Sequence, residues 1–100
     1  MESGKHFQPQ VRPRLRWQEG LYEALVEAFG PVPEPIRSFA FRRAVEEVEF
    51  RVMSEGGKEV SREALLTTLK VSVSHSMFNA LRRVLIKKEM LHDSEREENP

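Results

Sequence analysis

Apolar residues recur at helical spacing in four separate stretches of this chain. In the first stretch the apolar stripe consists of Leu21, Tyr22, Leu25, Val26 and Phe29. Because glutamates occupy the opposite side, the spacing predicts an amphipathic helix from about Gln18 to Phe29. Gly30 and the three prolines after it end this helix, since proline cannot continue the backbone ladder and disfavours helix at the residue before it.

The second stretch predicts a longer helix, from Pro35 to about Ser54. Proline suits the first helical turn, where its missing N–H is not needed, and Gly56-Gly57 supply a left-handed C-cap. The expected buried stripe is Ala40 or Phe41, Ala44, Val45, Val48 and Val52, with Met53 as a further candidate. On the solvated side we expect the i,i+4 ion pairs Arg42–Glu46, Arg43–Glu47 and Glu47–Arg51, each worth about 0.2–0.5 kcal/mol. We interpret these charges as structural.

A short break separates the third and fourth helices. Ser61 is the expected N-cap of the third helix, whose inward residues are Ala64, Leu65, Leu66 and Leu69. Residues 71–74 are β-branched or carry hydroxyls and end this helix, and Ser74 caps the fourth, from about His75 to Met90. The expected buried residues of the fourth helix are Met77, Phe78, Leu81, Val84 and Leu85, with Ile86 as a further candidate. The pattern therefore predicts an all-α domain of four helices over residues 17–91.

Both ends of the chain differ in composition from this domain. Residues 1–16 contain prolines, several basic residues and few apolar anchors, which predicts a flexible basic arm. Residues 92–100 are polar and acidic, which predicts a disordered tail. At the junction, Leu15 and Trp17 are expected to fold back on the first helix as a hydrophobic staple. The alternative is an arm that reaches a groove or an acidic partner.

Composition narrows the class of protein. One hundred residues, with 39% hydrophobic and 32% charged, suit one small domain with a modest core. No run approaches the roughly 20 apolar residues of a membrane span, and the first ten residues lack the apolar region of a secretory signal. Cysteine is absent, so we expect neither disulfides nor a thiolate nucleophile, and a cytoplasmic location.

The formal net charge is zero, but the charges lie in blocks. Residues 1–16 and 70–88 are basic, and the second of these segments contains no acidic residue. Glutamates between the two segments, and acidic residues after position 88, balance them. Two basic segments could meet a polyanion such as nucleic acid. The alternative is that blocks of this size are solvated helix faces.

The most specific pattern lies in residues 60–91, VSREALLTTLKVSVSHSMFNALRRVLIKKEML. It resembles, without gaps, the helix-turn-helix core of winged-helix regulators. The matching positions are Leu65, Leu69, Val71, Ser72, Ser74, Met77, Leu81, Arg82, Arg83, Lys87, Lys88, Met90 and Leu91. The residues expected to lock the two helices together are Leu65, Leu69, Val71, Met77 or Phe78, and Leu81. Such a crossing projects the start of the second helix toward the major groove. No β-hairpin wing is expected, because Glu89 stands where the family turns with glycine and HDSEREENP follows.

The resemblance implies that DNA contacts come from Ser72, Ser74, His75, Ser76, Asn79, Arg82 and Arg83. Asparagine can pair with adenine and arginine with guanine, while serine hydroxyls and the helix N-terminus suit phosphate oxygens. Lys70, Lys87 and Lys88 could add phosphate attraction that is independent of base sequence. The alternative is that these basic residues form the solvated face of an amphipathic helix.

A second resemblance covers residues 23–66. Its features are the turn Val32-Pro33-Glu34-Pro35-Ile36-Arg37, the Glu-rich helix that follows, GG and EVSREAL. This arrangement is similar to the small helical domain that ends the B subunit of light-independent protochlorophyllide reductase. It implies a non-catalytic module that docks on a larger complex, redox or tetrapyrrole-related. In this alternative Phe39, Phe41 and Phe50 would bind a protein partner, and a homodimer would suit either function.

Nothing in the sequence points to catalysis. His6, His75 and His92 lack the spacing of metal ligands, and the glutamates of the second helix offer no acid–base pair with a matching nucleophile. We therefore expect a protein that is not an enzyme and that uses no cofactor and no metal. The leading hypothesis is a DNA-binding helix-turn-helix protein, a small transcriptional or architectural regulator. The alternative hypothesis is a protein-interaction subunit.

Overall fold

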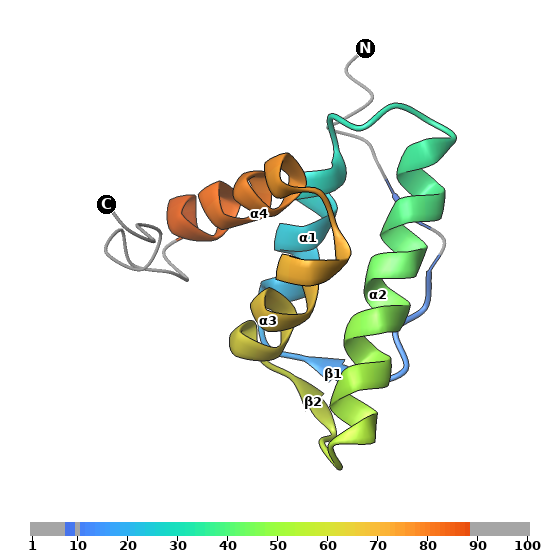
Figure 1. Cartoon of the computed structure of the whole chain (residues 1–100), viewed down its shortest axis with the longest axis vertical. Coiled ribbons are helices and arrows are strands. Elements are labelled where there is room, and N and C mark those ends of the chain that lie inside the picture. The colour runs from blue at the N-terminus through green and yellow to red at the C-terminus, as the bar shows by residue number, and fades with distance from the viewer. Residues whose placement is uncertain (1–7, 10, 89–100) are drawn as a thin grey trace.

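The computed structural model describes residues 8–9 and 11–88, and its helices confirm the all-α prediction (Figure 1). In order, this part of the chain forms β1 (Arg16–Trp17), α1 (Leu21–Phe29), α2 (Ile36–Ser54), β2 (Glu59–Val60), α3 (Arg62–Ser72) and α4 (His75–Lys87). The two short strands pair in parallel, with Arg16 beside Glu59 and Trp17 beside Val60. Three predicted features lie outside the described residues: the start of the arm, the end of the fourth helix beyond residue 88, and the acidic tail 92–100.

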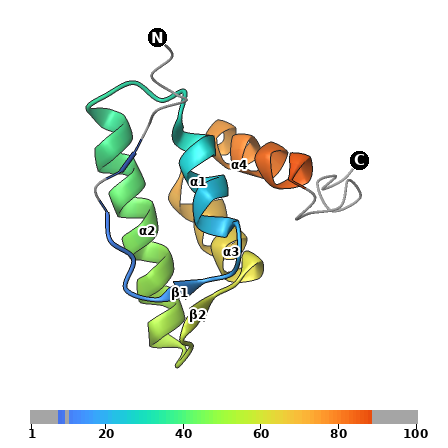
Figure 2. The same cartoon turned by 180° about the vertical axis from the view of Figure 1, so that it is seen from behind.

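The helices pack around one core. In both views α1 and α3 lie between α2 and α4 (Figures 1 and 2). The main helix contacts are those of α1 with α4 and of α2 with α3. The most completely buried large side chains are Phe29, Phe41, Leu21, Leu25, Leu65, Leu69, Leu81, Leu85, Val45, Val48 and Val60. In the described part of the chain, no helix is both long and apolar enough to cross a membrane.

Glycines set two of the helix boundaries. Gly56 has a left-handed φ of 81°, and the N–H of the following glycine donates to the carbonyl of Val52 at 2.8 Å. This is the predicted glycine cap of α2. The first helix begins at Leu21, later than the expected Gln18. Gly20 is left-handed there, with φ 84°, and the backbone N–H of Gln18 is already bound to β2 at 3.0 Å.

A buried carboxylate ties the segment before α1 to α2. Glu49 is only 3% exposed. Its two oxygens accept the N–H of Arg14 at 3.1 and 3.0 Å, and one also accepts the N–H of Leu15 at 3.1 Å. The indole Nε1–H of Trp17 donates to the same carboxylate at 2.8 Å. A buried carboxylate is costly unless its oxygens are hydrogen-bonded, and one short segment of chain meets that need here.

The same segment packs on α1. The Tyr22 hydroxyl donates to the carbonyl of Val11 at 3.1 Å, and the Trp17 and Tyr22 rings meet edge to face with centroids 5.5 Å apart. Burial raises the pKa of Tyr22, and the charges of Glu49 and Glu23 raise it further. Residues 11–16, which the sequence assigned to a flexible arm, therefore contact two helices. The hydrogen bonds of this segment are made by backbone groups, the N–H groups of Arg14 and Leu15 and the carbonyl of Val11. The order of side chains along the sequence does not reveal bonds to the backbone.

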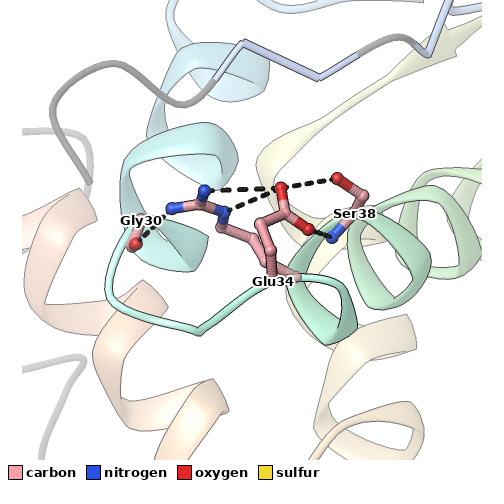
Figure 3. A network of polar contacts seen from close by, with 4 residues as sticks. Gly30, Glu34 and Ser38 are labelled. Carbon is pink, nitrogen blue, oxygen red and sulfur yellow. Dashed lines mark hydrogen bonds and ion pairs between the residues drawn. The ribbon is translucent and has the colours of Figure 1, made fainter. Parts of the chain in front are cut away.

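A second polar network fixes the connection between α1 and α2 (Figure 3). The guanidinium of Arg37, a residue only 6% exposed, donates to the carbonyl of Gly30 at 2.8 Å and to Glu34 Oε2 at 3.3 Å. Glu34 also accepts the Ser38 backbone N–H at 3.1 Å and its hydroxyl at 2.7 Å. The bond from the Ser38 hydroxyl is the main reason why the pKa of Glu34 is lowered. A cation thus binds a carbonyl at the end of α1, and a carboxylate holds the first turn of α2.

Replacing Glu49 with alanine removes the acceptor of these hydrogen bonds and leaves buried N–H groups unsatisfied. We expect the free energy of unfolding to fall by about 2–4 kcal/mol, measured by urea denaturation followed by far-UV circular dichroism. Glu46→Ala, on the exposed side of the same helix, is the matched control and should change it by less than about 0.5 kcal/mol. Equal, small effects of the two substitutions would contradict a stabilising role for the buried carboxylate.

Candidate functional site

Both α3 and α4 begin at the serine cap that the sequence predicts. The Ser61 hydroxyl accepts the N–H of Ala64 at 3.1 Å, and the Ser74 hydroxyl accepts the N–H of Met77 at 3.2 Å. Only two residues, Val73 and Ser74, separate the helices, and both have extended backbone. As a result α4 turns sharply and runs across the direction of α3 (Figure 1).

One residue assigned to the contact between these helices was predicted wrongly. Val71 was expected to help lock them together, but it is 81% exposed. The helix continues to Ser72 instead of breaking at residue 71, so Val71 lies about 200° around the axis from buried Leu69. Val73, in extended backbone after the helix, packs against the core in its place.

Most of the residues predicted to contact DNA are exposed on α4 or beside its N-terminal end. These exposed residues are Ser72, Ser74, His75, Ser76, Arg83, Lys87 and Lys88, while Asn79 is half-buried. All three serine hydroxyls already have partners within the chain, and those of Ser74 and Ser76 lie 3.4 Å apart. That of Ser74 caps α4, and that of Ser72 binds Glu47 of α2, which is the main reason why the pKa of Glu47 is lowered.

Arg82 does not lie on the exposed side of α4. It is 8% exposed, and its guanidinium carbon lies 5.7 Å from the centroid of the Phe78 ring. Arg82 follows Phe78 by four residues, so the two side chains lie on the same side of the helix. Arg83 is exposed. The prediction that both arginines are available to DNA is therefore corrected for Arg82, and for Arg83 it stays a prediction.

The two lysines at the end of α4 pair with an acidic residue of α1. Lys87 forms an ion pair with Glu27, and Lys88 Nζ lies 3.3 Å from the other carboxylate oxygen. The hydrogen bond from Lys87 is the main cause of a lowered pKa for Glu27. Both lysines are predicted sources of phosphate attraction, and one carboxylate offsets part of their charge. Of the other cations predicted to contact DNA, Lys70 and Arg83 are exposed and form no ion pair with a described residue.

The three phenylalanines predicted to bind a partner do not share one environment. Phe41 is fully buried, and its ring meets those of Tyr22 and Phe29 edge to face at 5.6 Å each. It therefore belongs to the core, and its assignment to a partner surface was wrong. Phe39 and Phe50 are 66% and 71% exposed, because they lie on the side of α2 opposite the buried stripe.

These two exposed rings border a hollow surface between α2 and the α3–α4 turn. One depression, of about 350 Å³, is lined by Phe39, Arg43 and Met77 among others. A second, of about 480 Å³, is lined by Phe50, Val71 and Thr68 among others. Both depressions are bordered by Arg43, Glu47 and Ser72. Glu47 lies 3.3 Å from the guanidinium of Arg43. This ion pair therefore lies between the depression that contains Phe39 and the depression that contains Phe50.

The sequence pattern did not predict the burial of two polar residues, Glu49 and Thr68. Glu49 follows Val45 by four residues and precedes Val52 by three, so its place within the apolar stripe is the signal that could have shown its burial. The Thr68 hydroxyl is buried and has no hydrogen-bond partner in the described structure. No pattern in the sequence distinguishes it from exposed Thr67.

Within the described residues, no group of three or more His, Asp or Glu side chains is placed to hold a metal ion. Neither a protein-family model, nor a curated protein, nor a solved structure matches this chain. Both resemblances therefore stay predictions, and the function must be argued from the geometry of the two surfaces.

Replacing Thr68 with valine preserves the shape of the side chain and removes the unpaired hydroxyl. We expect the protein to become more stable by about 1 kcal/mol, seen as a rise in Tm of roughly 4–8 °C by circular dichroism. Thr67→Val, at the exposed neighbouring position, should change stability by less than about 0.5 kcal/mol. A loss of stability in Thr68→Val would mean that the hydroxyl has a partner in solution.

The pairing of Glu27 with the two lysines makes stability depend on pH. Because folding lowers the pKa of Glu27 from its ordinary value of 4.5, the stabilisation is present above that value and is lost as pH falls through the folded pKa. The carboxylate is 38% exposed, so screening limits the effect to about 0.3–1 kcal/mol. Glu27→Gln should lower the free energy of unfolding by this amount at pH 7 and leave it nearly unchanged at pH 3. A difference that persists at pH 3 would contradict the ion pair as its source.

Proposed function

We propose that this protein binds duplex DNA through α3 and α4, with α4 entering the major groove. The proposal is supported by the two-residue turn, which makes α4 run across α3 and leaves its first turns exposed. In helix-turn-helix proteins the N-terminal residues of the second helix contact base edges while the first helix crosses the backbone. A reducing, cytoplasmic location is part of the proposal, since a chain without cysteine suits it.

The observation that carries the proposal is the composition of the outward side of α4. His75, Ser76, Asn79 and Arg83 follow one another along it, and the helix contains no acidic residue. An acid-free helix face keeps repulsion from phosphate low. Asn79 and Arg83 are one helical turn apart, a spacing at which an amide and a guanidinium can read neighbouring base edges.

The remaining polar groups supply positioning contacts. The Ser76 hydroxyl and the N-terminal end of α4 suit one phosphate, and exposed Lys70 at the end of α3 suits another. Lys87 and Lys88 are a smaller part of the proposal, because Glu27 competes for them. Surface ion pairs are weak, so a DNA phosphate can still replace that carboxylate.

A non-catalytic subunit that docks on a larger complex is the second candidate. The exposure of Phe39 and Phe50 favours it, since two large apolar side chains on one helix side are typical of interaction surfaces. The two candidates depend on different residues, those of α4 for DNA and those on the outward side of α2 for a protein, and the two surfaces adjoin at the depression lined by Phe39, Ser74 and Met77. Arg83 lines neither depression, so its substitution tests DNA binding without changing the apolar surface of α2.

DNA binding is measured by fluorescence anisotropy with a mixed-sequence duplex at low and near-physiological salt. We expect affinity to fall steeply with salt. Arg83→Ala should weaken binding about tenfold and flatten the salt dependence by about one unit of slope. Lys58→Ala removes the same charge from the exposed loop before β2 and should change affinity less than about twofold. Arg82 is left in place, because its burial would mix a folding effect into the result.

Two results would overturn the proposal. One is the absence of binding at low salt, which would leave α3 and α4 as a scaffold and favour the docking subunit. The other is equal weakening by Arg83→Ala and Lys58→Ala, which would show that net charge alone attracts DNA and that α4 is not the contact.

A further inference from the structure

The outward side of α2 is apolar at both ends and charged in the middle. Ile36 and Phe39 are 61% and 66% exposed near its start, and Phe50 and Met53 are 71% and 42% exposed near its end. These residues recur at spacings that place them on one side of a helix, opposite buried Phe41, Val45 and Val48. They account for four of the five large hydrophobic side chains exposed in the described part of the chain, and the fifth, Val71, borders the same depression as Phe50.

The order of these residues is nearly palindromic. Counting outward from the middle of α2, between Ala44 and Val45, Phe39 lies as far on one side as Phe50 does on the other. Ile36 and Met53 are equidistant in the same way. The basic residues Arg42 and Arg43 lie on the N-terminal side of the centre, and the acidic residues Glu46 and Glu47 lie at matching distances on the C-terminal side.

We propose that α2 pairs with α2 of a second copy of this chain, antiparallel and around a two-fold axis at its middle. Each Phe39 then lies against Phe50 of the other copy, and each Ile36 lies near Met53. On one flank Arg43 meets Glu47 of the other copy, and on the opposite flank Arg42 meets Glu46. An interface of this kind uses the same patch on both copies, as two-fold symmetry requires.

The order of basic and acidic residues along α2 indicates that the partner on this surface is a second, antiparallel copy of the chain. A parallel arrangement would set arginines against arginines and glutamates against glutamates, which like-charge repulsion disfavours. The antiparallel arrangement also opposes the two helix dipoles favourably. The ion pair Arg43–Glu47 within one chain is exposed and 3.3 Å long, so each of its members can share a partner across the axis at little cost.

The size of the surface sets the expected affinity. A helix of 19 residues is about 28 Å long, and four phenylalanine rings, two on each side of the charged middle, would be covered on pairing. This corresponds to the lower end of specific interfaces, near 1,000 Å² in total. We therefore expect a reversible dimer with a Kd on the order of 10 μM. The inference is independent of DNA binding, because α4 takes no part in it.

The test uses two charge variants of the full chain. In the acidic variant, Arg42→Glu and Arg43→Glu make the middle of α2 entirely acidic. In the basic variant, Glu46→Arg and Glu47→Arg make it entirely basic. Each variant alone should dimerise at least tenfold more weakly than the natural protein in sedimentation velocity over a concentration series. An equimolar mixture should restore dimerisation, because every cross-copy contact in the mixed dimer is again between opposite charges.

The mixture keeps the result interpretable if one substitution perturbs folding. A variant that failed to fold would not regain association when mixed, and circular dichroism of each variant checks helix content separately. Phe39→Ser with Phe50→Ser should abolish dimerisation in a second, uncharged test, while Lys58→Ser, which exchanges an exposed loop residue, should leave it unchanged.

Three outcomes would overturn the inference. The natural protein could remain monomeric at all concentrations, each charge variant alone could dimerise as well as the natural protein, or the mixture could fail to dimerise although both variants fold. Anisotropy with DNA on the Phe39→Ser, Phe50→Ser variant, whose net charge is unchanged, separates this result from the fate of the proposed function. If self-association is not observed but Arg83→Ala still weakens DNA binding, the dimer is overturned and DNA binding is retained. If the protein dimerises as expected but does not bind DNA, the proposed function is overturned and the dimer is retained.

Discussion

The carboxylate of Glu49 is the constraint on which the arrangement of the chain depends. It sits on the inward side of α2, where a charge is tolerated only if its oxygens are fully hydrogen-bonded. Arg14, Leu15 and Trp17 supply those bonds. Once Trp17 is held there, β1 lies beside β2 and the start of α3 is brought close to the start of α1. One buried acid thus links the segment before α1 to α2, and the strand pairing beside it links that segment to β2.

This arrangement gives α2 two distinct sides. Its inward side carries Phe41 and the valines that fill the core, with the rings of Tyr22 and Phe29 packed edge to face on Phe41. The outward side carries Phe39 and Phe50. The inward side of α2 packs on the core, and the elements in contact with this helix include α1, α3 and β2. The outward rings are therefore left for contacts beyond the chain, and their symmetric order about the centre of α2 suits another copy of itself.

Helix α4 shows how tertiary contacts divide a run of basic residues. Its sequence contains two arginines and a lysine, followed by Lys88. Packing on the core takes Arg82 inward beside Phe78, and contact with α1 brings Lys87 and Lys88 to Glu27. Arg83 is left facing solvent, together with His75 and Ser76 near the start of the helix, while Asn79 between them is half-buried. The surface available to DNA is accordingly narrower than the residues of the motif imply.

The sequence by itself determined the number of helices, the glycine cap of α2 and the serine caps of α3 and α4, because these depend on local spacing and on hydrogen bonds a few residues apart. It also placed most of the core, since helical periodicity identifies the inward stripe. Periodicity made Phe41 a candidate for that stripe, and only the tertiary structure decided that it belongs to the core and not to a partner surface, that Arg82 turns inward, and that residues 11–16 lie on the helices. The burial of Glu49 and of the Thr68 hydroxyl was decided there as well. These outcomes depend on which surfaces meet across long stretches of chain, and a pattern of neighbours along the sequence does not contain that information.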